Sequence, residues 1–162
     1  MQFLEPVPKV LAVSSGGGHW AELLRLRPAW DGADVVYVVT AAAYQSDLTR
    51  GGKGTRHVRG FFTVPDANKT QKLRLVALAI KMALVVLWVR PDVVLSTGAA
   101  PGYFAIRLGK WLGARTIWVD SIANADEISV AGRLARPHSD LWLSQWPDLS
   151  ARTGAGYAGA VM

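Results

Sequence analysis

Three consecutive glycines stand between an apolar run and a helical pattern near the start of the chain. Residues 10–20 read Val-Leu-Ala-Val-Ser-Ser-Gly-Gly-Gly-His-Trp, which predicts a buried strand, a tight turn and a helix N-terminus. Glycines let the backbone approach a ligand, and the free amides and dipole of a helix N-terminus favour an anion. We therefore interpret Gly16, Gly17 and Gly18 as a candidate phosphate-binding turn, although they match neither G-x-G-x-x-G nor the loop ending in Gly-Lys-Ser/Thr. The alternative is a turn that binds nothing.

Short apolar runs alternate with helical patterns along the rest of the chain. The run from Asp34 to Thr40 is unbroken, which is typical of a strand covered on both faces. Further strands are predicted at residues 9–14, 61–64, 92–96, 115–119, 140–143 and 157–161, helices at 20–27, 70–89 and 103–112, a loop at 41–60, a loop with a short helix at 120–136, and a glycine-rich tail from 147. This order predicts an α/β fold with one Rossmann-like domain over residues 1–162, in which helices cover both faces of a parallel sheet.

Charge and cysteine content narrow the classes of partner and chemistry. The 162 residues include 18 Lys and Arg against 12 Asp and Glu, a net charge of +6, which suits anionic lipid, a phosphorylated substrate or nucleic acid. We expect no nucleic-acid partner, since no recognition motif is present. The chain has no cysteine, which excludes disulfides, thiolate zinc sites and cysteine nucleophiles. His57 and His138 have no partner at helical spacing, so we expect no metal site and no cofactor. Without a signal-peptide pattern, we expect a cytoplasmic protein.

Three polar or glycine-containing turns directly follow predicted strands. They are residues 16–19, 97–102 and 120–124. In a parallel sheet the carboxyl ends of the strands meet at one edge, which is where such folds gather their ligands. The three turns are therefore expected to form one site.

The predicted helix at residues 73–89 is almost wholly apolar, with Lys81 in its middle. A membrane-spanning helix needs about 20 apolar residues, and a central lysine is costly, so we expect that it does not span. Arg74 and Lys81 share a helix face, which suits a helix lying in the membrane interface with its cations toward the headgroups. The alternative is a crossover helix buried against the sheet with Lys81 reaching outward. The basic stretch at residues 50–72 favours the membrane.

Four motifs in a fixed order carry a family resemblance. They are Ser15–His19, Pro91–Gly98, Asp120–Leu134 and Gln145–Leu149. Together they resemble the acceptor-binding, membrane-associated subunit of the split GT-B glycosyltransferases. This family helps to add the second N-acetylglucosamine to the dolichol-linked oligosaccharide in eukaryotes, and its bacterial relatives serve in capsule and exopolysaccharide synthesis. The resemblance covers about residues 9–150 and implies that the chain is the N-terminal half of a GT-B enzyme.

The resemblance also implies a division of labour between two chains. A nucleotide-sugar-binding glycosyltransferase subunit, the partner, would hold a UDP-sugar. This chain would hold a lipid-pyrophosphate-linked saccharide acceptor at the cytoplasmic face of the membrane, as a peripheral or monotopic protein, with the active site between the subunits. Two positions depart from the family pattern and bear on the acceptor sugar: Asp120 stands where many members have glutamate, and Asn124 where an arginine is common.

Two residues are candidates for the base that such a transfer needs. His19 follows the glycine turn at a helix N-terminus, where the dipole favours a neutral imidazole able to take a proton from the acceptor hydroxyl or to bind its sugar or pyrophosphate. Asp120 ends a strand and is the alternative base. A histidine that only caps the turn, and Asp120 or Ser121 as a plain helix N-cap, are the structural interpretations. The candidate acceptor- or phosphate-binding residues are Gly16, Gly17, Gly18, Thr97, Gly98, Ser121 and Arg133.

Two other functions stay open from the sequence. One is a non-catalytic membrane scaffold that recruits the transferase subunit. The other is a nucleotide-binding Rossmann-like domain, although the acidic residue expected at the end of the second strand is replaced by Thr40.

Overall fold

A seven-stranded parallel sheet forms the centre of the computed structural model, which describes residues 6–50, 58–68 and 70–161. The strands are β1 Lys9–Val13, β2 Asp34–Val39, β3 Val58–Thr63, β4 Val93–Ser96, β5 Arg115–Val119, β6 Leu141–Ser144 and β7 Gly156–Tyr157. Their order is β3-β2-β1-β4-β5-β6-β7, and every neighbouring pair is parallel. The strand order reverses between β1 and β4, and such a switch point is where ligands bind in open α/β sheets.

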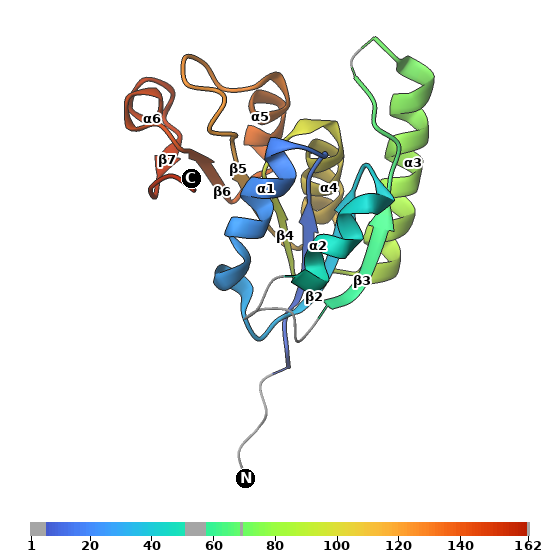
Figure 1. Ribbon diagram of the computed structural model, residues 1–162. Coiled ribbons are helices and arrows are strands. Elements are labelled where there is room, and N and C mark those ends of the chain that lie inside the picture. The colour runs from blue at the N-terminus through green and yellow to red at the C-terminus, as the bar shows by residue number, and fades with distance from the viewer. Residues whose placement is uncertain (1–5, 51–57, 69, 162) are drawn as a thin grey trace.

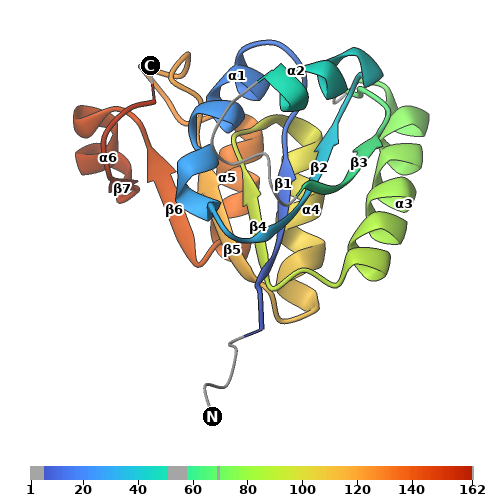
Figure 2. The same ribbon diagram turned by 60° about the horizontal axis from the view of Figure 1, so that its bottom comes forward.

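Helices cover both faces of the sheet, as the sequence predicts (Figures 1 and 2). They are α1 Gly18–Arg25, α2 Gln45–Arg50, α3 Lys72–Val89, α4 Ala99–Trp111, α5 Val130–Ala135 and α6 Pro147–Thr153, with 3-10 turns at Arg27–Trp30, Ala42–Tyr44 and Arg136–His138. One core cluster joins α1 and α2 to one face of the sheet, and a second joins α3, α4 and α5 to the other. The predicted Rossmann-like α/β class is confirmed.

Strand β1 explains why the apolar runs do not alternate with polar residues. Its successive side chains point to opposite faces, so Leu11 and Val13 pack beneath α3 and α4 while Val10 and Ala12 pack beneath α1. The side chains of the neighbouring strand β2 alternate between the same two faces in the same way. A strand covered on both sides must be apolar at nearly every position.

Some predicted boundaries are wrong. The expected loop at 41–60 contains a 3-10 turn and α2, and β3 begins at Val58 rather than Phe61; the glycine-rich stretch 51–54 lies outside the described residues. Helix α4 begins at Ala99 rather than Tyr103, because a helix tolerates Pro101 in its first turn. The expected glycine-rich tail contains α6, whose first residue is Pro147. The last strand is shorter than predicted and ends at Tyr157.

Helix α3 has two apolar faces. Its buried face packs on the sheet through Leu78, Met82, Val85, Val86 and Val89. Its opposite face carries six large apolar side chains that are 54–88% exposed: Leu73, Val76, Ile80, Leu84, Leu87 and Trp88. The helix therefore packs on the sheet as the crossover alternative predicts and exposes an apolar face on its other side, whereas contact with a membrane stays a prediction. In the described part of the chain, no helix combines the length and apolarity that crossing a membrane requires.

Candidate functional site

Two turns meet at the carboxyl ends of β1 and β4. The imidazole Nδ1 of His19, in α1, lies 3.0 Å from the carbonyl oxygen of Thr97, and the Thr97 hydroxyl donates to the carbonyl of His19 at 2.7 Å. These reciprocal bonds join residues that are 78 positions apart. The expectation that these two turns lie together at the carboxyl ends of the strands is confirmed.

The bond to Thr97 fixes the tautomer of His19. A backbone carbonyl can only accept, so the hydrogen lies on Nδ1 and, in a neutral ring, Nε2 keeps a free lone pair. The side chain is partly exposed, whereas Thr97 is fully buried. His19 is thus held by one ring nitrogen and can present the other to a ligand as a proton acceptor.

Gly98 makes room for this imidazole. A Cβ atom at position 98 would lie 2.6 Å from Cε1 and 2.7 Å from Nδ1 of His19, and the backbone has φ 142°. Ala99 follows with φ 65°, a left-handed conformation that costs an L-residue roughly 1–2 kcal/mol. Strain of this kind, beside a close backbone-to-imidazole contact, is typical of functional sites.

The three glycines of the first turn have different roles. The amide of Gly16 donates to the Thr40 hydroxyl at 3.0 Å, and that of Gly17 donates to the Tyr44 hydroxyl at 2.8 Å. Both amides are therefore used within the protein, and Gly17 also supplies the φ of 69° with which α1 begins. The amide of Gly18 lies in the first turn of α1, where the helix itself offers no acceptor. This restricts the candidate anion contact to Gly18 and the residues that follow it.

Two helix N-termini, those of α1 and α4, converge beside His19. Within the described residues, neither has a side-chain cap or an acidic residue in its first turn. Their first-turn amides, including those of Gly18, His19 and Ala100, have no intrahelical acceptor, and both dipoles favour negative charge at this point. The arrangement suits an anion with oxygens on two sides, such as a pyrophosphate.

A buried carboxylate that the sequence analysis missed lies beneath this site. Glu22 is 3% exposed and accepts hydrogen bonds from the Ser121 hydroxyl at 2.7 Å, the Ile122 amide at 3.3 Å and the Gln145 side-chain amide at 3.1 Å. Gln145 also donates to the carbonyl of Asp120 at 3.0 Å. Glu22 therefore joins α1 to the ends of β5 and β6.

The sequence contained a signal for Glu22. It lies three residues after His19 and between Trp20 and Leu23, both of which are buried. A carboxylate on the inward face of an amphipathic helix needs partners inside the protein, and that requirement could have been stated before the structure.

Asp120 holds a loop in place. Its carboxylate is 1% exposed and accepts four hydrogen bonds: from Trp118 Nε1 at 3.1 Å, Asn124 Nδ2 at 3.1 Å, and the amide and hydroxyl of Ser129 at 3.0 and 2.6 Å. Ser129 is in turn the N-cap of α5. A Cβ atom at Gly132 would come within 2.6 Å of the same carboxylate. Both oxygens of Asp120 are therefore occupied by the protein itself.

Arg133 lies apart from the histidine. Its guanidinium donates to the carboxylate of Glu127 at 3.2 Å and to the carbonyl of Ile128 at 2.7 Å. It lines a cavity of about 420 Å³ with Arg136 and Arg152. None of the hydrogen bonds in the described structure joins Arg133 to His19 or to its neighbours.

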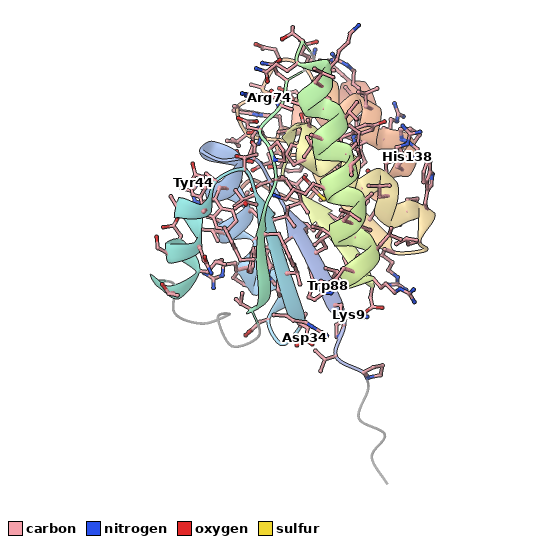
Figure 3. All side chains as sticks on the ribbon, turned by 90° about the vertical axis from the view of Figure 1, so that its right-hand side faces the viewer. Lys9, Asp34, Tyr44, Arg74, Trp88 and His138 are labelled. Carbon is pink, nitrogen blue, oxygen red and sulfur yellow. The ribbon has the colours of Figure 1, made fainter. Side chains whose placement is uncertain are left out.

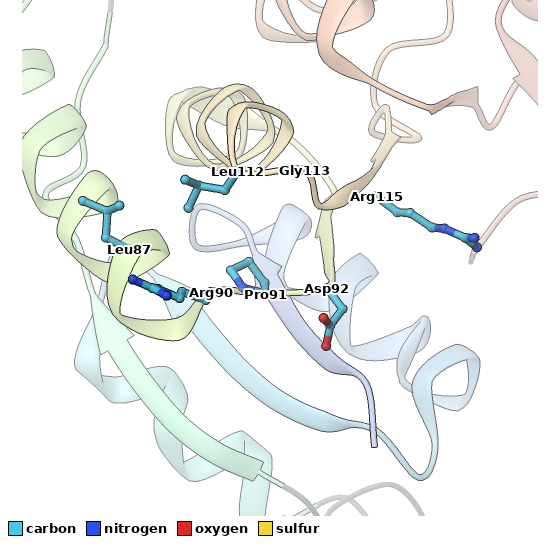
Figure 4. A pocket seen from close by; sticks show the side chains of 7 residues that line it. All are labelled: Leu87, Arg90, Pro91, Asp92, Leu112, Gly113 and Arg115. Carbon is cyan, nitrogen blue, oxygen red and sulfur yellow. The ribbon is translucent and has the colours of Figure 1, made fainter. Parts of the chain in front are cut away.

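A larger cavity lies at the other end of the strands, near the amino ends of β4 and β5. It measures about 460 Å³ and is lined by Arg90, Asp92 and Arg115 among others. In Figure 4 the two arginine side chains extend to opposite sides, and the Asp92 carboxylate accepts from the amide of Lys9 at 2.8 Å. The polar groups therefore do not converge on one point. The described residues also contain no cluster of three or more His, Asp or Glu side chains that could hold a metal ion.

The fold and the histidine-bearing glycine turn define one Rossmann-like half of a GT-B architecture. The solved structures that it resembles agree: MurG from Acinetobacter baumannii has a TM-score of 0.67 at 10% identity over 87% of this chain and 42% of that chain. The chain matches the family model described as "Oligosaccharide biosynthesis protein Alg14 like" over residues 10–161, and it belongs to that family.

Two further comparisons define how far the likeness extends. A curated relative, the UDP-N-acetylglucosamine transferase subunit alg14 of Schizosaccharomyces pombe, is 30% identical over 181 residues, which cover 97% of this chain and 85% of the relative. A solved UDP-N-acetylglucosamine 2-epimerase has a TM-score of 0.67 at 12% identity, over 93% of this chain and 46% of that chain. The chain spans less than half of either solved structure, and a transferase and an epimerase share its fold, so the fold alone does not decide the reaction.

Proposed function

We propose that this chain is the acceptor-binding subunit of a two-chain glycosyltransferase, which transfers a sugar from a UDP-sugar to a lipid-pyrophosphate-linked saccharide. The observation that carries the proposal is His19, fixed on Thr97 beside two uncapped helix N-termini. Because the chain spans one half of the GT-B structures, a partner subunit would supply the half that binds the nucleotide-sugar. The S. pombe relative is named a transferase subunit, which supports an enzyme made of more than one chain.

The chemistry assigned to His19 is that of a general base. The acceptor hydroxyl oxygen attacks the anomeric carbon of the donor while the bond from that carbon to the UDP oxygen breaks. The hydroxyl proton passes to Nε2 of His19, and UDP leaves on the partner's side with its negative charge. A positioned base of this kind contributes about 10²–10⁴-fold to the rate. Asp120 is assigned a positioning role instead, since its four hydrogen bonds leave no oxygen free for a proton.

The same site would hold the pyrophosphate of the acceptor. The first-turn amides of α1 and α4 face it with the positive ends of both dipoles, and the net charge of +6 adds a long-range attraction. In this arrangement the sugar at the other end of the pyrophosphate lies near Nε2 of His19. Gly98 permits it, because any side chain there would displace the imidazole.

The outward face of α3 would contact the membrane. Its exposed apolar side chains recur at spacings of three or four residues and so form one stripe along the helix. Helical spacing places Arg74 and Lys81 on one border of this stripe and Lys72 on the other, all of them exposed. In Figure 3 the helix runs along the outside of the molecule, with Arg74 near one end and Trp88 near the other. An apolar stripe bordered by cations suits a peripheral or monotopic position on an anionic cytoplasmic leaflet.

A reconstitution measures the proposed activity directly. Membranes containing this chain alone, the partner subunit alone, or both are supplied with labelled UDP-sugars, and label in extractable lipid is counted. We expect transfer only with both chains. Equal transfer by the partner alone would reduce this chain to the membrane scaffold, and tight binding of a dinucleotide by the isolated chain would favour the nucleotide-binding alternative.

A further inference from the structure

An apolar groove lies next to the candidate site on the helical layer of α3, α4 and α5. It measures about 250 Å³ and lies between the segment that leads into α3, represented by Ala67, the first turns of α4 and the outer face of α5. From α5 it is lined by Val130 and Leu134, each 53% exposed. Asn68 and Tyr103 are the polar residues of its lining, and the Tyr103 hydroxyl accepts a hydrogen bond from Arg107 at 2.9 Å.

The groove and the anion-binding amides share the first turn of α4. Ala100 lines the groove, and it lies two residues after Gly98, whose backbone packs against the ring of His19. The N-terminal turn of α4 therefore lies against His19 through Gly98 and against the groove through Ala100. A ligand that joins a pyrophosphate to an apolar chain has the same two parts in the same order.

We propose that this groove binds the first carbons of the acceptor's lipid chain, those next to the pyrophosphate. The inference rests on the proposed function, and it adds a second ligand contact on the acceptor side. The lining carries no charged side chain and consists mostly of alanine, valine and leucine, which suits an uncharged apolar chain. The stripe on α3 begins at Leu73, five residues after Asn68, so the rest of the chain can continue toward the membrane from there.

Chain-length dependence of binding tests the groove separately from the anion site. The full chain is titrated calorimetrically with inorganic pyrophosphate, geranyl pyrophosphate and farnesyl pyrophosphate, each below its micelle concentration. We expect the isoprenoid pyrophosphates to bind at least about tenfold more tightly than pyrophosphate, because each buried methylene adds to the affinity. Leu134→Gln and Val130→Gln are expected to lower the affinity for farnesyl pyrophosphate about tenfold and to leave that for pyrophosphate unchanged.

Two matched measurements make the result decisive. Both groove residues are half-exposed on a helix, so the variants should unfold at the same temperature as the wild type. Leu141→Gln, an exposed leucine on β6, is the control that should bind all three ligands as the wild type does, and Leu84→Gln tests the stripe on α3 as the alternative lipid site. Equal affinity for all three ligands, or wild-type binding by both groove variants, would overturn the groove while leaving the proposed function intact. Loss of chain-length dependence in Leu84→Gln alone would move the lipid to α3 and overturn it too. If pyrophosphate itself does not bind, the anion site and the groove both fail.

Discussion

Helices α1 and α3 both follow a strand and cover the sheet, yet they depart from the usual distribution of polarity in opposite ways. Helix α1 turns a carboxylate inward: Glu22 is 3% exposed and joined to Ser121 and Gln145. Helix α3 turns leucines outward, and Leu84 is 63% exposed. Scattered apolar residues on a surface are ordinary, whereas a buried charge or a continuous exposed apolar stripe calls for an explanation.

The buried carboxylate of α1 and the exposed apolar stripe of α3 differ in what contacts them. Inside the protein, Glu22 is matched by three donors, so its burial stabilises the contact between α1 and two loops that are about 100 residues away. The stripe on α3 stays more than half exposed, with one ring contact from Trp88 to Phe62 at 5.5 Å between centroids, while the other face of the helix packs on the sheet. In our proposal, α1 therefore organises the candidate site, and the exposed face of α3 contacts the membrane.

Replacing His19 gives the largest expected effect, and it acts on the site without touching Glu22. We expect His19→Gln to lower the rate of transfer by the two-chain enzyme about 10²–10⁴-fold, since glutamine can keep a hydrogen bond to Thr97 but cannot take the proton. The free energy of unfolding should change little, because the ring is partly exposed. The rate is measured as labelled sugar in lipid. Unchanged transfer would assign the chain to the scaffold alternative.

Removing the buried carboxylate comes next. Glu22→Ala leaves the Ser121 hydroxyl and the Gln145 amide without their acceptor in a buried place, which we expect to cost about 3 kcal/mol of unfolding free energy. Urea denaturation measures it. Glu127→Ala is the matched control: its carboxylate is 80% exposed and pairs with a surface arginine, so the change should stay within about 0.5 kcal/mol. Equal effects of the two variants would contradict the structural role of Glu22.

The sequence predicts where the turns of the candidate site lie in the sheet better than it predicts which side chains hydrogen-bond to one another. Strand ends are local features, so the turns at His19 and Thr97 could be assigned to one edge of the sheet from alternation alone. The partners of Glu22 could not, because Ser121 and Gln145 are 99 and 123 residues away and only the packing of α1 brings them together. The four donors to Asp120 are close in sequence, within nine residues, but three of them belong to an irregular loop whose conformation no periodic pattern predicts, so the sequence alone leaves Asp120 as a candidate base.

Proline gave the wrong element boundaries, because the same residue can begin a helix or end one. The sequence pattern predicts a glycine-rich tail from Pro147, yet Pro147 is the first residue of α6. Proline is favoured at this position because its missing amide would be unpaired there in any case. Pro101 likewise lies inside the first turn of α4. The position of a proline within the helix, which the sequence does not show, decides whether it starts or ends the element.

A double substitution on α3 tests the outward surface. Leu84→Gln with Trp88→Gln removes two of the large side chains from the stripe, and we expect binding to vesicles of anionic phospholipid to fall at least tenfold, since each buried side chain contributes about 1.5–3 kcal/mol. Vesicle flotation measures it. Leu141→Gln, an exposed leucine on β6, serves as control and should bind as the wild type does. Undiminished vesicle binding by the double variant would mean that α3 faces something other than lipid.

Replacing one cation at the border of the stripe gives the smallest effect and separates charge from apolar contact. Lys81 is exposed in the middle of α3, and a lysine near an anionic surface contributes about 1 kcal/mol, so Lys81→Gln should weaken binding to anionic vesicles about fivefold. Neutral vesicles should bind both proteins equally, and the difference should shrink with added salt, because charges farther apart than about 8 Å are screened at physiological ionic strength. If the loss is the same on neutral vesicles, Lys81 acts through its aliphatic chain, and the attraction must come from the apolar stripe alone.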